Sequence, residues 1–115
     1  MRTTISVILC TFCICMYAQW QPVSGHLNTD WSARVDPSNV LGEHPHPLME
    51  RKEWMSLNGL WNYAIRDKGA VEPMLFDGKI LVPYPIESSL SGVGKHPTAN
   101  QELWYEREFE LPRRW

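Results

Sequence analysis

Alternating apolar and polar positions mark the middle of the chain. Along segment 60–66, one side of an extended backbone carries only large apolar groups, contributed by Trp61, Tyr63 and Ile65. Alternation with a period of two residues predicts a β-strand with one buried face, as in an antiparallel sheet. A second, shorter strand is expected at 79–82, where a β-rich apolar run follows a turn signal of the Asp-Gly type.

A third strand is expected at 103–111, where aromatic and aliphatic groups alternate with glutamates. Glu106, Glu108 and Glu110 form either the solvent-facing side of a half-buried strand or an acidic ligand groove, and the alternation favours the solvent-facing side. Arg107 falls on the apolar side of this strand. It therefore requires either a carboxylate partner inside the fold or a bulge that shifts the register.

A proline-rich loop follows the second strand. Pro83 and Pro85 lack a backbone donor and fix φ, so a β-ladder cannot continue through them. Small and polar residues come next, including Glu87 and Ser88, with apolar residues on either side. A stiff connection into a polar, anchored loop suits a binding surface on a β-scaffold. An ordinary crossover between two sheets would give the same pattern.

The first 18 residues have the pattern of a secretory signal peptide. Arg2 supplies positive charge, and 5–17 is an apolar core of suitable length, with a cleavage site expected after Ala18. A membrane span needs roughly 20 apolar residues, so no stable span is expected, and a retained signal anchor is the alternative. We therefore expect export to the periplasm or the extracellular space. All three cysteines lie in this segment, so the mature part is expected to contain no thiol.

Residues 19–49 are expected to form an extended arm. Four prolines interrupt the segment, and neither a helical nor a strand period is present in it. His44 and His46 stand two residues apart, which is a spacing that metal sites also use. The prolines favour an extended backbone and no cysteine or third histidine is near, so we expect no metal site and no cofactor.

Composition argues against one class of partner and leaves two uses of the tryptophans open. The chain of 115 residues has a formal charge of −2, and its longest basic cluster is Arg113-Arg114, which argues against nucleic acid as a partner. Its six tryptophans are an unusual number for this length. Buried β-cores and carbohydrate-stacking surfaces both use tryptophan, so the count is compatible with either.

Three blocks of the sequence resemble the sugar-binding domain of glycoside hydrolase family 2, the family of β-galactosidases, β-glucuronidases and β-mannosidases. The blocks are Trp-Met-Ser-Leu-Asn-Gly-Leu-Trp at 54–61, Phe-Asp-Gly-Lys-Ile-Leu-Val-Pro-Tyr-Pro-Ile-Glu-Ser-Ser-Leu-Ser-Gly-Val at 76–93 and Leu-Trp-Tyr-Glu-Arg-Glu-Phe-Glu-Leu-Pro at 103–112. Their order and spacing extend the resemblance over about residues 44–115. The resemblance implies an all-β fold in which residues 50–115 are the incomplete first part of a galactose-binding-like jelly-roll β-sandwich.

The resemblance also implies a function. In such enzymes this domain precedes an immunoglobulin-like domain and a (β/α)₈ barrel, and the barrel carries both catalytic glutamates. The chain is thus expected to be the N-terminal part of an exported glycosidase that cleaves β-glycosides, with a galactoside as the default substrate. Alone it is expected to be inactive, with no catalytic residue of its own and with the missing domains as partners. Glu87 and Ser88 are the expected contacts to sugar hydroxyls, unless Glu87 instead ties down its own loop.

Two other function classes stay open at the level of sequence. The chain could be a free-standing secreted carbohydrate-binding module that uses exposed tryptophans. It could also be a secreted β-sandwich interaction domain without affinity for sugars. Neither the sugar and its linkage nor the oligomeric state follows from the residues.

Overall fold

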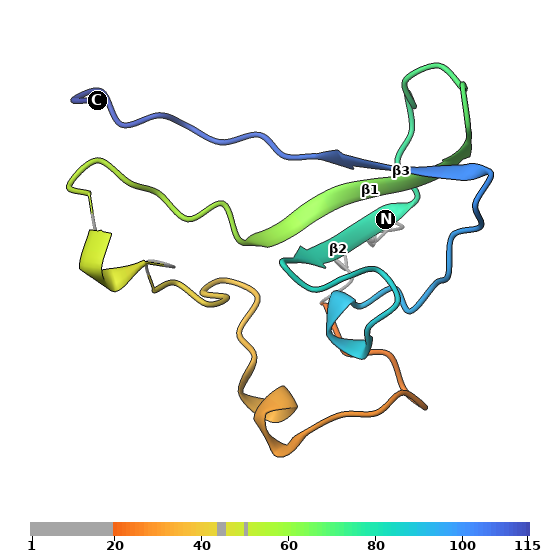
Figure 1. The fold of residues 1–115 in the computed structure, drawn as a ribbon, viewed down its shortest axis with the longest axis horizontal. Helices are drawn as coiled ribbons and strands as arrows, with labels where there is room; N and C mark the ends of the chain where they lie inside the picture. Colours follow the sequence, from red (N-terminus) through yellow and green to blue (C-terminus); the bar gives the residue numbers. More distant parts are fainter. Residues whose placement is uncertain (1–19, 44–45, 50) are drawn as a thin grey trace, which may run out of the picture.

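The centre of the protein is a three-stranded antiparallel sheet with the strand order β2-β1-β3 (Figure 1). The computed structural model describes residues 20–43, 46–49 and 51–115. The strands are β1 (Gly59–Asp67), β2 (Gly78–Val82) and β3 (Gln101–Glu106). The only helical elements in the described segments are the short 3₁₀ turns η1 (Asp30–Arg34), η2 (Pro47–Met49) and η3 (Ser89–Ser91). A small β-rich fold is therefore confirmed, and the second sheet of the expected jelly roll is not among the described residues.

β1 lies at the centre of the sheet because it pairs with a neighbour along each edge. Trp61 is opposite Ile80 of β2, and Tyr63 is opposite Tyr105 of β3. The face that carries Trp61 and Tyr63 is the one that the alternating pattern predicts to be apolar. β2 ends at Val82, so the predicted end of this strand at the proline-rich segment is confirmed.

β3 is shorter than the predicted strand 103–111, because it ends at Glu106. Arg107 comes next, and its guanidinium Nη1 donates to the carbonyl oxygens of Leu57 and Asn58, just ahead of β1. Arg107 does lie on the apolar side, over the Trp61 ring, but its partners are backbone carbonyls and not the expected carboxylate. The expected bulge is absent, because the β1–β3 register continues to Glu106 without one. Glu108 and Glu110 are exposed beyond the sheet.

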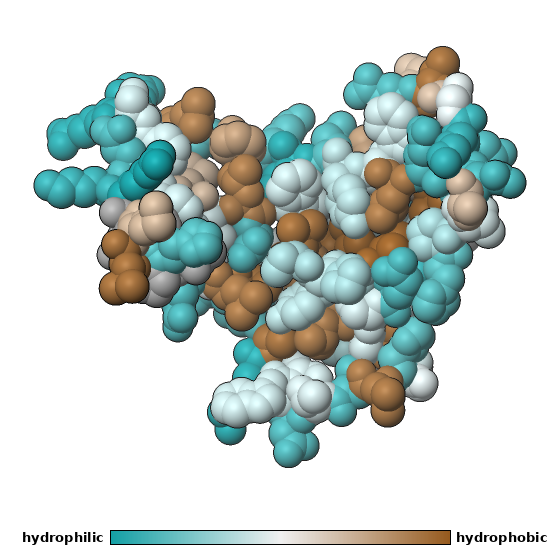
Figure 2. All heavy atoms as spheres, viewed as in Figure 1, coloured by the Kyte–Doolittle hydropathy of each residue, from teal (hydrophilic) through white to brown (hydrophobic). Residues whose placement is uncertain are grey.

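The main core cluster lies on the Trp61 face of the sheet, whereas Ala64 and Leu81 are buried on the opposite face. Tyr63, Ile80 and Ile86 are buried on the Trp61 face, with five partly buried apolar side chains around them: Trp61, Ile65, Val82, Val93 and Leu103. Ile86 and Val93 come from the loop that follows β2, so this loop folds back over the sheet. In Figure 2, apolar side chains gather across the middle of the molecule, and the outer parts carry mainly hydrophilic side chains together with some exposed apolar ones.

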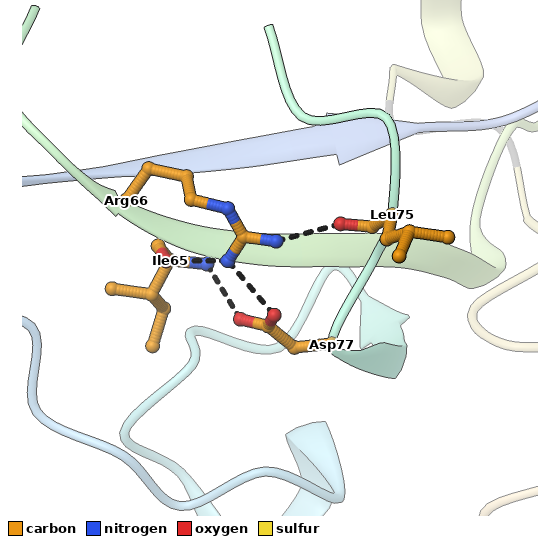
Figure 3. Close-up of polar contacts among 4 residues, drawn as sticks. All are labelled: Ile65, Arg66, Leu75 and Asp77. Carbon is orange, nitrogen blue, oxygen red and sulfur yellow. Dashed lines mark hydrogen bonds and ion pairs between the residues drawn. The ribbon is translucent and has the colours of Figure 1, made fainter. Parts of the chain in front are cut away.

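A polar clamp closes the connection between β1 and β2 (Figure 3). Arg66 donates through Nη1 to Asp77 Oδ1 at 2.8 Å and through Nη2 to the Leu75 carbonyl at 2.6 Å. The other carboxylate oxygen of Asp77 accepts the backbone N–H of Ile65 at 2.9 Å. The Ile65 N–H, followed by the Arg66 guanidinium, lowers the pKa of Asp77.

The segment ahead of β1 contains no strand or α-helix in its described part, 20–43 and 46–49. Figure 1 shows it looping away from the sheet between η3 and the start of β1. Asp36 begins a turn, in which Asn39 N donates to the Asp36 carbonyl at 3.1 Å. The expected signal peptide and its cleavage site, and also His44, lie outside the described residues. Among those described, no helix is long and apolar enough to cross a membrane.

Candidate functional site

The loop after β2, residues 83–94, is organised around one buried hydroxyl. Ser91 has no exposed surface, and its Oγ lies 2.7 Å from the Ser88 carbonyl and 3.0 Å from the Ile86 carbonyl, to which it can donate. The same oxygen accepts the backbone N–H of Val93 at 3.0 Å. A single side chain thus satisfies backbone groups on both sides of the bend, which holds the loop in one shape.

The N-terminal segment braces this loop from outside. Val23 N donates to the Ser89 carbonyl at 3.0 Å, and Ser89 Oγ donates to the Val23 carbonyl at 2.9 Å. Gly92 has a φ of +77° and lies so close to Trp20 that an added Cβ would be 2.8 Å from the indole. A side chain at this position would therefore collide with the Trp20 ring, so the close contact requires glycine.

Ser88, one of the two predicted sugar contacts, has a structural role. It is the N-cap of η3, where its Oγ accepts the Ser91 N–H at 3.2 Å and donates to the Pro85 carbonyl at 2.8 Å. Its only hydrogen is used inside the loop. One acceptor lone pair is left for a ligand.

Glu87, the other predicted contact, is exposed and makes no hydrogen bond or ion pair with the described residues. The alternative in which Glu87 ties down its own loop is therefore not observed. Burial is the larger cause, and the negative charge of Glu87 the smaller, of a raised pKa of the Tyr105 hydroxyl.

A shallow hollow of about 290 Å³ lies between the end of β2 and the Tyr105 ring. Its lining residues are mostly aromatic or proline: Trp61, Val82, Pro83, Tyr84, Pro85 and Tyr105. The rings of Trp61 and Tyr105 stand at 88° to one another with centroids 6.4 Å apart, so they form a corner. Trp61 Nε1 donates to the Leu57 carbonyl at 2.8 Å, which fixes the indole in place.

A larger open groove of about 1180 Å³ has Pro83 as a lining residue in common with this hollow. Its walls are residues 39–43 of the N-terminal segment and residues 54–58 ahead of β1. The Asn58 side chain donates to the Val40 carbonyl at 3.2 Å and so holds the two walls together.

The hollow combines flat apolar rings with a phenolic hydroxyl. In the described part of the chain, no group of three or more His, Cys, Asp or Glu side chains could hold a metal ion. Neither Glu87 nor Ser88, the two predicted contacts, lines this hollow, and sequence reasoning did not name Tyr84 or Tyr105, which do. Tyr84 carried a signal, because it stands between the two prolines, whereas the position of Tyr105 depends on strand pairing.

No family model matches the chain, and no curated protein matches it either.

Proposed function

We propose that this chain is the N-terminal part of an exported glycoside hydrolase of family 2, acting on β-glycosides. One observation supports this most. All six residues that line the hollow belong to the three sequence blocks that resemble the family's sugar-binding domain: Trp61 to the first, 82–85 to the second and Tyr105 to the third. Segments far apart in the sequence that resemble one family thus meet at one place in the fold.

In this proposal the chain supplies scaffold and rim contacts, and the chemistry takes place elsewhere. The free Glu87 carboxylate, on a loop held rigid by Ser91, accepts a hydrogen bond from a sugar hydroxyl. Retaining hydrolysis requires two carboxyl groups about 5–5.5 Å apart across the glycosidic bond, and these would be carried by a barrel domain. The three strands would be part of one sheet of a jelly-roll sandwich. A galactoside is the default substrate.

The test uses the full product of the gene and the 115-residue chain side by side. A panel of nitrophenyl β-glycosides, including the galactoside, should be hydrolysed by the full product and not by the chain. Glu87→Gln in the full product should raise KM, because the substituted amide accepts a sugar hydrogen bond less strongly than a carboxylate. Glu110→Gln, on the exposed tail, is the control and should leave KM unchanged.

Two results would refute this proposal. One is a full product without hydrolysis of any β-glycoside. The other is turnover by the 115-residue chain that Glu87→Gln abolishes. Export is tested separately by N-terminal sequencing and thiol labelling of material recovered outside the cytoplasm. The mature chain should begin near Gln19 and carry no thiol, and a labelled product would contradict the expected cleavage.

A free-standing carbohydrate-binding module is the second candidate, because the hollow is open in the chain by itself. Tyr105 keeps 42% of its surface exposed, and aromatic rings exposed beside polar groups are suited to sugar stacking. This candidate would be favoured if the chain binds glycosides and the full product of its gene hydrolyses none. If the chain binds no glycoside and the full product hydrolyses none, a non-enzymatic interaction domain is the remaining candidate.

A further inference from the structure

Asn58, just ahead of β1, is the only one of the five asparagines in the chain that is followed by glycine. We propose that Asn58-Gly59 is a site of spontaneous deamidation, that the docked N-terminal segment slows this reaction, and that the product cannot keep the contact that holds the segment in place. The proposal is independent of the carbohydrate function. The other asparagines are followed by larger residues: Thr29, Val40, Tyr63 and Gln101.

The reaction needs only the chain and water. After a solvent base removes the proton of the Gly59 amide, the amide nitrogen attacks Cγ of the Asn58 side chain. A bond forms between these two atoms, the bond from Cγ to Nδ2 breaks, and Nδ2 leaves as ammonia, which gives a five-membered succinimide. Water then opens the ring at either carbonyl, so the residue becomes aspartate or isoaspartate. Glycine at position 59 favours the attack, because it has no Cβ to obstruct the approach.

The fold holds both reacting groups by hydrogen bonds. Asn58 Nδ2 donates to the carbonyl oxygens of Val40 at 3.2 Å and Leu41 at 3.4 Å, which ties the side chain to the N-terminal segment. The Asn58 carbonyl oxygen accepts from Arg107 Nη1 at 2.8 Å, and this bond restrains the planar peptide group that also contains the Gly59 nitrogen. Closing the succinimide ring couples the rotations about Cα–Cβ and Cα–C of Asn58. The reaction should therefore be slow until the contact with 40–41 opens.

The product turns this contact from attraction into repulsion. An aspartate at position 58 has only acceptor oxygens at neutral pH, so it would face the Val40 and Leu41 carbonyls without a hydrogen to donate. Val40 is only 4% exposed, so water has little access to replace the lost donor. Leu41 has a φ of +43°, a left-handed conformation that is uncommon for leucine, and it would lose a contact that holds it there. The segment should therefore separate from Asn58 after the reaction.

The same contact links the two walls of the open groove. Residues 39–43 form one wall and residues 54–58 the other, and the Asn58 amide joins them. Isoaspartate would also add a methylene to the main chain directly ahead of the pair of Gly59 with Val82 in the sheet. Loss of ammonia followed by hydrolysis does not reverse in water. Deamidation should thus release residues 39–43 from this site permanently.

The first experiment tests the reaction and its control by the fold. The 115-residue chain is incubated at mildly alkaline pH, once in buffer and once in concentrated urea, and each asparagine is followed by peptide mass mapping with enzymatic detection of isoaspartate. Asn58 should be converted first in both states. In buffer its conversion should be at least about fivefold slower than in urea, because both hydrogen bonds of Nδ2 must open and each neutral bond corresponds to roughly a two- to tenfold change.

The second experiment tests the consequence with Asn58→Asp, which supplies one of the two products directly. Amide hydrogen exchange is read at Asn39, whose N–H donates to the Asp36 carbonyl at 3.1 Å, and at buried Val40. Both amides should exchange at least about fivefold faster in the variant, because one buried contact is lost and an acceptor faces an acceptor. Asn100→Asp is the matched control. It adds the same charge at an exposed position whose side chain makes no hydrogen bond with the described residues, and it should leave both amides unchanged.

Three results would overturn the proposal. They are conversion of another asparagine ahead of Asn58, a ratio of the two rates below about fivefold, and unchanged exchange at Asn39 and Val40 in Asn58→Asp. Should Asn58→Asp fail to fold, exchange is measured on the more acidic fraction of the aged unmodified chain, which ion exchange separates by its added negative charge. That fraction has folded before it reacts, so it decides the same question.

Discussion

Ser91→Ala should loosen the loop that carries Glu87 while leaving the three-stranded sheet intact. Ser91 has no exposed surface, and its Oγ accepts the N–H groups of Val93 at 3.0 Å and Gly94 at 3.3 Å. It also donates its one hydrogen, with the Ser88 carbonyl as the nearest acceptor at 2.7 Å. Alanine keeps the Cβ and removes only the oxygen, so the change tests hydrogen bonding rather than packing.

The magnitude follows from the groups left without a partner. A buried donor that loses its acceptor costs about 1–3 kcal/mol, and at least the nearer of the two N–H groups is left in this state. The lost donation to a carbonyl adds about 0.5–1.5 kcal/mol. We therefore expect the loop to be destabilised by about 2–4 kcal/mol. Since 1.4 kcal/mol corresponds to a factor of ten, its opening should become roughly 30-fold more frequent or more.

Amide hydrogen exchange measured residue by residue is the direct assay, because it reports local opening. The amides of Val93 and Gly94 should exchange much faster in Ser91→Ala, and amides in β1 should be unaffected. Ser88→Ala should have a smaller effect of about 1 kcal/mol, as expected for an N-cap, and exposed Ser24→Ala should have none. Protection of Val93 within threefold of the unmodified chain would refute the role assigned to Ser91.

Three further predictions concern the sheet and its connections. The pKa of Asp77 is lowered in the folded state, so its carboxylate stabilises the fold above the unfolded pKa of about 3.9, and this stabilisation is lost as the pH falls below that value. Asp77→Asn should therefore lower the free energy of unfolding at pH 7 by about 1 kcal/mol, a figure discounted for exposure. In acid unfolding curves the variant should lose less stability between neutral and low pH than the unmodified chain. Gly92→Ala should destabilise the protein by more than Gly69→Ala in thermal unfolding, because both have φ near +78° but only Gly92 lies against a side chain, and equal effects would contradict that contact. Ile80→Ala should reduce the free energy of unfolding by about 2–5 kcal/mol, because Ile80 is fully buried, whereas Val71→Ala, at an 88% exposed position, should change it by less than about 0.5 kcal/mol.

Local physical chemistry accounts for what the sequence predicted well. The alternation of Trp61 and Tyr63 with polar neighbours indicates a strand and its buried face, because side chains of an extended backbone point to opposite sides in turn. Pro83 ends β2 because it lacks a backbone donor. Such rules act within a few residues, so no knowledge of the fold is required. The exposed Glu87 was found in the same way, from polar residues that follow a stiff segment.

The end of β3 is an example of what pattern alone could not predict. Alternation continues past Glu106 to Leu111, yet β3 ends at Glu106, and the Arg107 side chain donates to the carbonyls of Leu57 and Asn58. Arg107 is 50 residues from Leu57 and 49 residues from Asn58 along the chain. A periodic pattern reports which side chains share a face. It does not report whether a neighbouring backbone is available for pairing.

The candidate site is likewise divided between sequence and tertiary structure. By itself the sequence determined the strands β1 and β2, the stiff loop after β2 and the exposed acid within it, since all of these follow from short-range sterics and polarity. Tertiary structure decided that the rings of Trp61 and Tyr105 form a corner and that Ser89 binds Val23, 66 residues away. The physical reason is that strand register and loop docking are set by the packing of the whole chain, and no local preference specifies which distant segments meet.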